Sequence, residues 1–236
     1  MSSFKKKTKW TEIQLFGIEL IFSDLKKYQI LIESFLSKEK KELEKDFSES
    51  DLKKEAKKAG KKKDQYYQHL IDSYSEKHHE ITKQFPHSFR ASFLVQIISV
   101  IESQLREICN QYGNQKKQKF KVDDIKGSND LEKCKLYLTT ITDIDFKIYS
   151  REWQFIKQCK LLRNRIVHHN STIKIKDKNL IDFVKNTKSI EFLNYEESFE
   201  QEELYYINIE FIIVNNELID KLLVLSKEFF NKLLRK

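Results

Sequence analysis

The sequence predicts an all-α protein, an up-and-down helical bundle with a long N-terminal helical extension. The 236 residues contain one proline and four glycines, so the residues that build repeated β-turns are scarce. Hydrophobic residues make up 39% of the chain, which is enough for a buried core. Long stretches repeat apolar residues every three or four positions, which is the spacing of an amphipathic helix.

The N-terminal extension covers residues 1–84. Helical spacing runs from Trp10 to Phe35, can continue through the charged residues that follow, and resumes from Tyr66 to Phe85. Between these stretches, residues 51–63 hold seven lysines and two acidic residues. This segment is either a solvated helix face or hairpin tip, or an arm that contacts phosphates without reading sequence. Pro86 predicts a boundary between helices, so the bundle is placed at residues 85–236.

The bundle is expected to contain four main helices with the same apolar spacing. They cover Phe89–Tyr112, Leu131–Thr140, Ser150–Asn170 and Ile207–Leu234. Ser128 or Asn129 is the expected N-cap of the second helix. Residues 171–178 are polar and predicted to be irregular. Ser189–Leu193 and Glu203–Ile207 are either loop segments or two short strands, which would make a β-hairpin near residues 189–207.

Arginine, histidine and asparagine are concentrated at the end of the third helix of the bundle. This cluster consists of Arg163, Asn164, Arg165, His168, His169 and Asn170. Arg163 falls on the apolar face of that helix, and a guanidinium there needs a carboxylate partner or a cleft. Glu102, which borders the apolar face of the first bundle helix, either reaches for water or pairs with Arg163 or Arg165.

The motif Arg163-Asn164-x-x-x-His168 resembles the R-x(4–6)-H motif of the HEPN superfamily. The resemblance covers about residues 85–236, and it implies a small all-helical domain. Many members are metal-independent endoribonucleases that act as dimers in toxin–antitoxin, abortive-infection and CRISPR systems. The resemblance therefore implies a composite site at a homodimer interface. Some relatives carry a modifiable tyrosine two residues after the motif histidine, but that position is Asn170 here.

The residues of the cluster suit metal-free cleavage of RNA. Such cleavage needs a base for the 2′-hydroxyl, an acid for the leaving 5′-oxygen and a cation for the charged phosphorane. His168 is the candidate acid or base, Arg163 holds the phosphate, and Asn164 orients it or caps the helix. Arg165, His169 and Glu102 are secondary candidates. The products would carry 2′,3′-cyclic phosphate and 5′-hydroxyl ends.

Two other interpretations of the cluster stay open. Arg163 can be a core arginine paired with Glu102, with His168, His169 and Asn170 forming a polar helix end that the helix dipole favours. In that case the protein is an inactive HEPN-like module that binds RNA or docks onto a partner protein. Alternatively, it is a helical adaptor that uses its lysine-rich segment.

Charge and cysteine content bound the partners and the compartment. The formal net charge of +8 favours RNA or another anionic partner. Weak RNA-binding candidates are Lys116, Lys117, Lys119 and Lys121. No basic residue occurs between Lys188 and Lys221, so that acidic stretch would repel a nucleic acid. Three isolated cysteines and the lack of an apolar signal core favour the cytoplasm.

Motifs of other enzyme classes are absent from the sequence. There is no glycine-rich phosphate loop, H-E-x-x-H, C-x-x-C or G-x-S-x-G motif. His78 and His79 have no second ligand pair at metal-binding spacing. We therefore expect no metal and no cofactor. The expected partners are RNA, a second copy of the chain, and an antitoxin or another protein of a defence complex.

Overall fold

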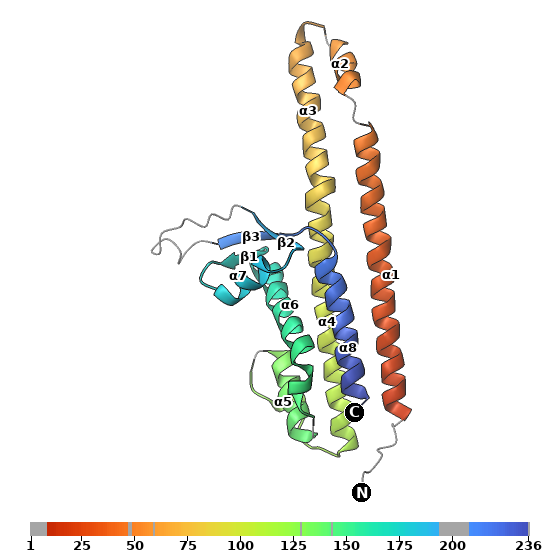
Figure 1. Cartoon of the computed structure of the whole chain (residues 1–236), viewed down its shortest axis with the longest axis vertical. Coiled ribbons are helices and arrows are strands. Elements are labelled where there is room, and N and C mark those ends of the chain that lie inside the picture. The colour runs from red at the N-terminus through yellow and green to blue at the C-terminus, as the bar shows by residue number, and fades with distance from the viewer. Residues whose placement is uncertain are drawn as a thin grey trace.

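The computed structural model describes residues 9–46, 49–58, 60–127, 129–142, 144–193 and 208–235. Two long antiparallel rods dominate it (Figure 1). The first is α1 (Lys9–Asp46), and the second joins α3 (Lys63–His79) to α4 (Phe85–Gln115). The short helix α2 (Glu49–Lys57) and a 3₁₀ turn at Gly60–Lys62 lie at the far tip, where the rods connect. The predicted helical fold class is confirmed, and α1 continues through the charged residues after Phe35.

The second rod passes Pro86 without changing direction (Figure 1). We predicted that this proline separates two helices, and α4 does begin at Phe85, but the chain makes no turn there. A π-helical turn, Glu80–Gln84, joins the two segments, and the Phe85 N–H donates to the Glu80 carbonyl. Pro86 then occupies the first turn of α4, where backbone N–H groups have no acceptor within the helix, so the N–H that proline lacks is not missed as a hydrogen-bond donor.

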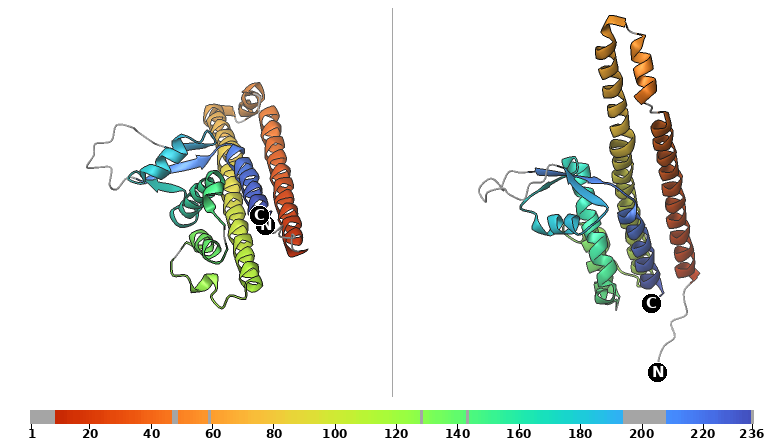
Figure 2. Two further views of the ribbon diagram at one scale, coloured as in Figure 1. Left: turned by 60° about the horizontal axis from the view of Figure 1, so that its bottom comes forward. Right: turned by 45° about the horizontal axis from the view of Figure 1, so that its top comes forward.

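The helical bundle consists of α4, α5 (Asp130–Ile141), α6 (Ser150–His169) and α8 (Glu217–Leu234). These bounds confirm the predicted α5 and α6 to within a residue or two. Asn129 caps α5, since its Oδ1 accepts the Leu131 N–H at 3.2 Å. At the base of α6 the Trp153 ring packs against Phe146 and Phe229, with ring centroids 5.2 and 5.6 Å apart. Helix α8 lies between α4, α6 and α1 (Figure 2).

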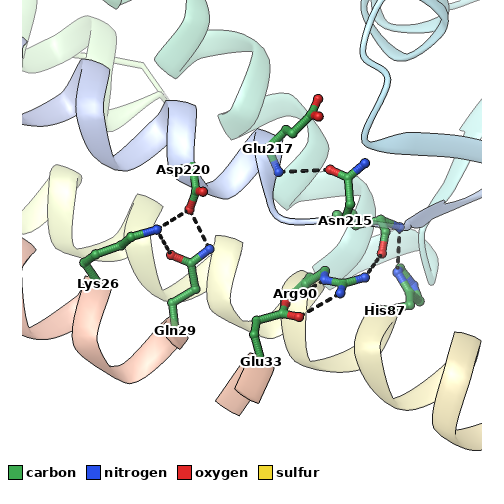
Figure 3. Close-up of polar contacts among 9 residues, drawn as sticks. Lys26, Gln29, Glu33, His87, Arg90, Asn215, Glu217 and Asp220 are labelled. Carbon is green, nitrogen blue, oxygen red and sulfur yellow. Dashed lines mark hydrogen bonds and ion pairs between the residues drawn. The ribbon is translucent and has the colours of Figure 1, made fainter. Parts of the chain in front are cut away.

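Helix α1 packs onto this bundle. Ile18, Phe22 and Leu25 are buried in the same hydrophobic core as the bundle helices. Polar contacts reinforce the packing (Figure 3). Arg90 of α4 makes a two-pronged ion pair with Glu33 of α1, with Nε–Oε1 and Nη2–Oε2 distances of 2.7 and 2.8 Å. The N-terminal half of α1 therefore belongs to the same packed body as α4 and α8.

A small antiparallel sheet covers the end of α6. Its strands are β1 (Thr172–Lys174), β2 (Ile190–Leu193) and β3 (Asn208–Ile213), in the order β1-β3-β2. Helix α7 (Lys178–Lys185) lies between β1 and β2 in the chain. The register places Ile190 opposite Ile213, and Ile173 opposite Ile209.

The predicted hairpin exists, but its second strand is not the one that we expected. Residues 208–213 were assigned to the last helix, and that assignment was wrong, because they form β3 and α8 begins at Glu217. Ile209, Phe211 and Ile213, which lie on one side of β3, are buried, and Ile212 is buried on the other side. Residues 171–178, predicted to be irregular, contain β1. The predicted strand Glu203–Ile207 lies outside the described residues.

Candidate functional site

The packing of α6 determines where the motif residues lie. Its buried face, which includes Trp153, Ile156, Cys159 and Leu162, sits in the bundle core. The helix ends at His169, because Asn170 adopts the left-handed conformation with φ 47° and ψ 49°. The backbone N–H groups of Asn170 and Ser171 both donate to the carbonyl oxygen of Arg165, which closes the helix end. The chain then enters β1, which leaves His168 and His169 exposed.

The three catalytic candidates and the three secondary candidates all line one cleft. Its volume is about 990 Å³, and it lies between the C-terminal half of α6 and the beginning of α7, with contributions from α4 and α5. The predicted residues on its wall are Arg163, Asn164, Arg165, His168, His169 and Glu102. Arg163 and His168 are five residues apart, on different sides of a straight helix. They reach the same cleft at the point where α6 ends.

Arg163 has no carboxylate partner among the described residues. Its guanidinium is half-buried, and Nη1 donates to the Asn164 Oδ1 at 3.3 Å. Its Nε is buried and makes no hydrogen bond to any described residue. A guanidinium in this state retains donors for a bound anion, which it can hold through two parallel N–H···O bonds. Asn164 is placed to orient the guanidinium.

The prediction that Glu102 pairs with Arg163 or Arg165 is wrong. Glu102 instead accepts a hydrogen bond from Lys160, in an ion pair whose two side chains are each 15% exposed. Lys160 precedes Arg163 by about one helical turn, so it faces α4 earlier along α6. Arg165 pairs with Asp177, just before α7. The interpretation of Arg163 as a core arginine neutralised by Glu102 is therefore excluded.

The other charges of the cleft largely neutralise one another. Its wall contains five lysine or arginine residues and three aspartate or glutamate residues. Glu102 and Asp177 are held by Lys160 and Arg165, and the third carboxylate, Asp130, lies 3.4 Å from Arg106. Within the described chain, Arg163 has no such carboxylate partner. The cleft therefore has a net positive wall that favours an anionic ligand.

Sequence reasoning missed part of the cleft. Lys160, Asp177, Lys178 and Asn179 also line it. Asp177 is the N-cap of α7, and Lys178 and Asn179 are its first residues, whereas we expected residues 171–178 to be irregular. A signal for this helix was present, because Leu180, Ile181 and Val184 have helical spacing and are all buried.

The other predicted basic sites lie away from the cleft. Lys116, Lys117, Lys119 and Lys121 are exposed in the connection after α4, and none lines the cleft wall. The lysine-rich segment lies at the far tip of the two rods (Figure 1). A role for either in binding RNA stays a prediction. The acidic side chains Glu191 and Glu210 are exposed on the sheet, whereas residues 194–207 are outside the described ranges.

Neither a metal centre nor a membrane span is found in the described ranges. No group of three or more His, Cys, Asp or Glu side chains there could hold a metal ion. Cys109, Cys134 and Cys159 are buried free thiols. Among the helices described, none has both the length and the apolar character required to cross a membrane.

Comparisons of the chain with protein-family models, curated proteins and solved structures found no match. The interpretation of the site therefore depends on its own geometry and on the motif.

Proposed function

We propose that the protein is a metal-independent endoribonuclease of the toxin or antiphage-defence type, with its active site in the cleft at the end of α6. One observation carries the proposal. A half-buried arginine without a carboxylate partner among the described residues, Arg163, lines the same open cleft as the exposed imidazole of His168. This pairing supplies a phosphate-binding cation and a group that transfers protons near neutral pH. The motif's resemblance to HEPN proteins supports the same assignment.

The proposed reaction is an internal transesterification. The 2′-oxygen of the ribose attacks the adjacent phosphorus after a base removes its proton, and the bond to the 5′-oxygen breaks as an acid protonates that oxygen. Arg163 binds the non-bridging phosphate oxygens and stabilises their growing charge in the transition state. Asn164 orients the guanidinium. The products carry 2′,3′-cyclic phosphate and 5′-hydroxyl ends.

A second proton-transfer group is required, because one histidine cannot act as acid and base in the same step. In the proposed composite site, His168 of the partner subunit supplies it across a homodimer. Within one protomer, His169 lines the same cleft and is the alternative. The two arrangements differ in their concentration dependence. The composite site loses specific activity on dilution below the dimer dissociation constant, whereas a site built with His169 does not.

Incubation of the purified protein with total RNA in excess chelator tests this function. We expect cleavage. A polynucleotide kinase should label the new 5′ ends without prior phosphatase treatment, because they carry a hydroxyl group. The new 3′ ends should become ligatable only after the cyclic phosphate has been removed. Overexpression should arrest growth, and His168→Ala should relieve the arrest. Cleavage that requires an added divalent metal, or growth arrest that persists in the His168→Ala variant, would contradict the proposal.

One observation favours an inactive RNA-binding or protein-docking module as the second candidate. No hydrogen bond to another described residue orients the His168 ring, although catalytic histidines usually have such a partner. In this alternative, Arg163 binds an RNA phosphate in the cleft and no bond is broken. RNA binding that is lost in Arg163→Ala, without cleavage by the wild type, would identify this case.

A further inference from the structure

Helix α1 is apolar on two opposite sides. One side, with Ile18, Phe22 and Leu25, is buried against the bundle. The other side carries large apolar residues that face solvent. Phe16 is 70% exposed and Leu31 is 64% exposed, and Leu20 and Phe35 are exposed as well. At 3.6 residues per turn, these four residues form one stripe on the side of α1 opposite the core. Such a patch on a helix marks an interaction surface.

The apolar residues of the stripe are arranged symmetrically about a central pair of opposite charges. In order along α1 its central members are Phe16, Leu20, Asp24, Lys27, Leu31 and Phe35, with successive members three or four residues apart. Ile13, which is 62% exposed, continues the same face before Phe16. The middle pair, Asp24 and Lys27, forms an exposed ion pair at 3.0 Å within the helix. Apolar residues of the same kind flank this pair at equal distances on both sides. A surface with this pattern is complementary to a second copy of itself running in the opposite direction.

We infer that two copies of the chain associate through α1, antiparallel, about a two-fold axis that passes between Asp24 and Lys27. In this arrangement Phe16 meets Phe35 of the partner subunit, and Leu20 meets Leu31 of the partner subunit. Asp24 meets Lys27 of the partner subunit, so the central ion pairs are exchanged between the copies. Each of Phe16, Leu20, Leu31 and Phe35 then has an apolar partner, and each of the two central charges has an opposite charge.

The surroundings of α1 leave room for this partner. Helices α4 and α8 lie on the core side of α1, and its other side is the outer edge of the molecule (Figures 1 and 2). An antiparallel copy would extend its own tip past the N-terminal end of α1, away from α2 and α3. The cleft lies beyond α4 and α8, on the side of α6 and α7, so both clefts stay open. This interface is therefore independent of the proposed nuclease site, and a composite site would need a different contact.

Sedimentation of the full chain over a range of concentrations tests the inference. We expect concentration-dependent self-association, and Leu31→Glu should raise the dissociation constant of the α1 contact roughly 100-fold or more, because each α1 pair then buries two charged residues. Association through the separate nuclease contact should be unchanged by this substitution. Ile30→Glu is the matched control. Ile30 is the next residue on the same helix and 56% exposed, but it lies off the stripe, so the control should keep the wild-type constant. A monomer at all concentrations, or a dimer insensitive to Leu31→Glu, would overturn the inference.

Charge exchange and crosslinking test the direction of pairing. Asp24→Lys alone should weaken the dimer by placing like charges opposite each other, and the double variant Asp24→Lys with Lys27→Asp should restore it. A mixture of Leu20→Cys and Leu31→Cys proteins should form a disulfide on oxidation. Leu31→Cys alone should not, because its two copies would lie roughly 16 Å apart along the helix axis. A disulfide between two Leu31→Cys chains would contradict the antiparallel arrangement. A protein that stays monomeric but binds lipid vesicles through this stripe would contradict a second copy as the partner.

Discussion

Arg163 differs from two other cations of the cleft, Lys160 and Arg165, in its environment. Lys160 and Arg165 are held by Glu102 and Asp177, whereas the Arg163 Nε is buried without a partner among the described residues. Leaving a charged donor unsatisfied in a folded protein costs free energy unless a ligand completes it. We propose that this position serves to bind a phosphate.

Replacing Arg163 should separate function from stability. In Arg163→Ala, Glu102 keeps its Lys160 partner, so the free energy of unfolding should stay within about 1 kcal/mol of the wild type. Loss of the phosphate-binding cation should lower the RNA cleavage rate by about 100- to 1,000-fold. Arg151→Ala, an exposed arginine at the beginning of the same helix, is the control and should change neither quantity. A large loss of stability in Arg163→Ala would mean that this arginine mainly supports the fold.

His87 makes the stability of the protein depend on pH. Its Nδ1 accepts the Ile213 N–H at 3.1 Å, which requires the neutral ring (Figure 3). Burial lowers the pKa of His87 below its ordinary value of 6.5, and the nearby charge of Arg90 adds to this effect, while Glu210 opposes it. Because the unfolded chain binds the proton more readily, stability should be complete above pH 6.5 and fall as the pH drops toward the lowered pKa.

Urea unfolding of wild type and His87→Asn between pH 7.5 and 5 measures this dependence. Asparagine offers an acceptor oxygen near the position of Nδ1 but does not titrate. In the variant, the free energy of unfolding should therefore fall less steeply between pH 6.5 and 5 than in the wild type. An equal slope in both proteins below pH 6.5 would show that His87 does not control it.

At the scale of elements, one buried ion pair links α1 to α4, in addition to their apolar contacts. Arg90 and Glu33 are 11% and 16% exposed, and Arg90 Nη1 also donates to the Ile213 carbonyl at 3.2 Å, at the end of β3 (Figure 3). One side chain thus connects α1, α4 and the sheet. Exposed pairs on the same molecule, such as Lys54 with Asp51, lack this burial.

Arg90→Ala should therefore destabilise the protein by about 3 kcal/mol, because it leaves the Glu33 carboxylate buried without its partner. Lys54→Ala should change the free energy of unfolding by less than about 0.5 kcal/mol, as expected for a solvent-exposed pair. Denaturant unfolding of the two variants provides the comparison. Equal effects of the two substitutions would show that burial of the Arg90 pair has little energetic consequence.

Most of the long helices were predictable from the sequence because their signals are local. Apolar spacing gave the bounds of α6 and the first part of α1, and the end residues reduced the cap of α5 to Ser128 or Asn129. The strand β3 was missed because its residues are apolar and directly precede an apolar helix. It is identified by pairing with β1 and β2, which are distant in sequence. The continuity of the rod at Pro86 depended on a π-turn that periodicity does not reveal.

At the scale of the whole molecule, the sequence predicted the members of the cleft better than their pairing. All six expected residues line it, because they lie at the end of one helix or on the neighbouring helix α4. The expected pairing of Glu102 with Arg163 or Arg165 was wrong, because its partner is Lys160. Lys160 and Arg163 are three residues apart on α6, and only the packing of the helices decides which one faces α4. That difference matters for the proposed function, which requires Arg163 without a carboxylate partner.

The most direct test of the nuclease assignment is the single-turnover cleavage rate of a defined RNA in chelator, for wild type, His168→Ala and His79→Ala. His79 is an exposed histidine at the end of α3 that does not line the cleft, and it serves as the matched control. We predict cleavage by the wild type and by His79→Ala, at least a 100-fold slower rate for His168→Ala, and no cleavage of the same sequence with a 2′-deoxy residue at the scissile position. Equal rates for wild type and His168→Ala, or cleavage of the 2′-deoxy substrate, would contradict this account.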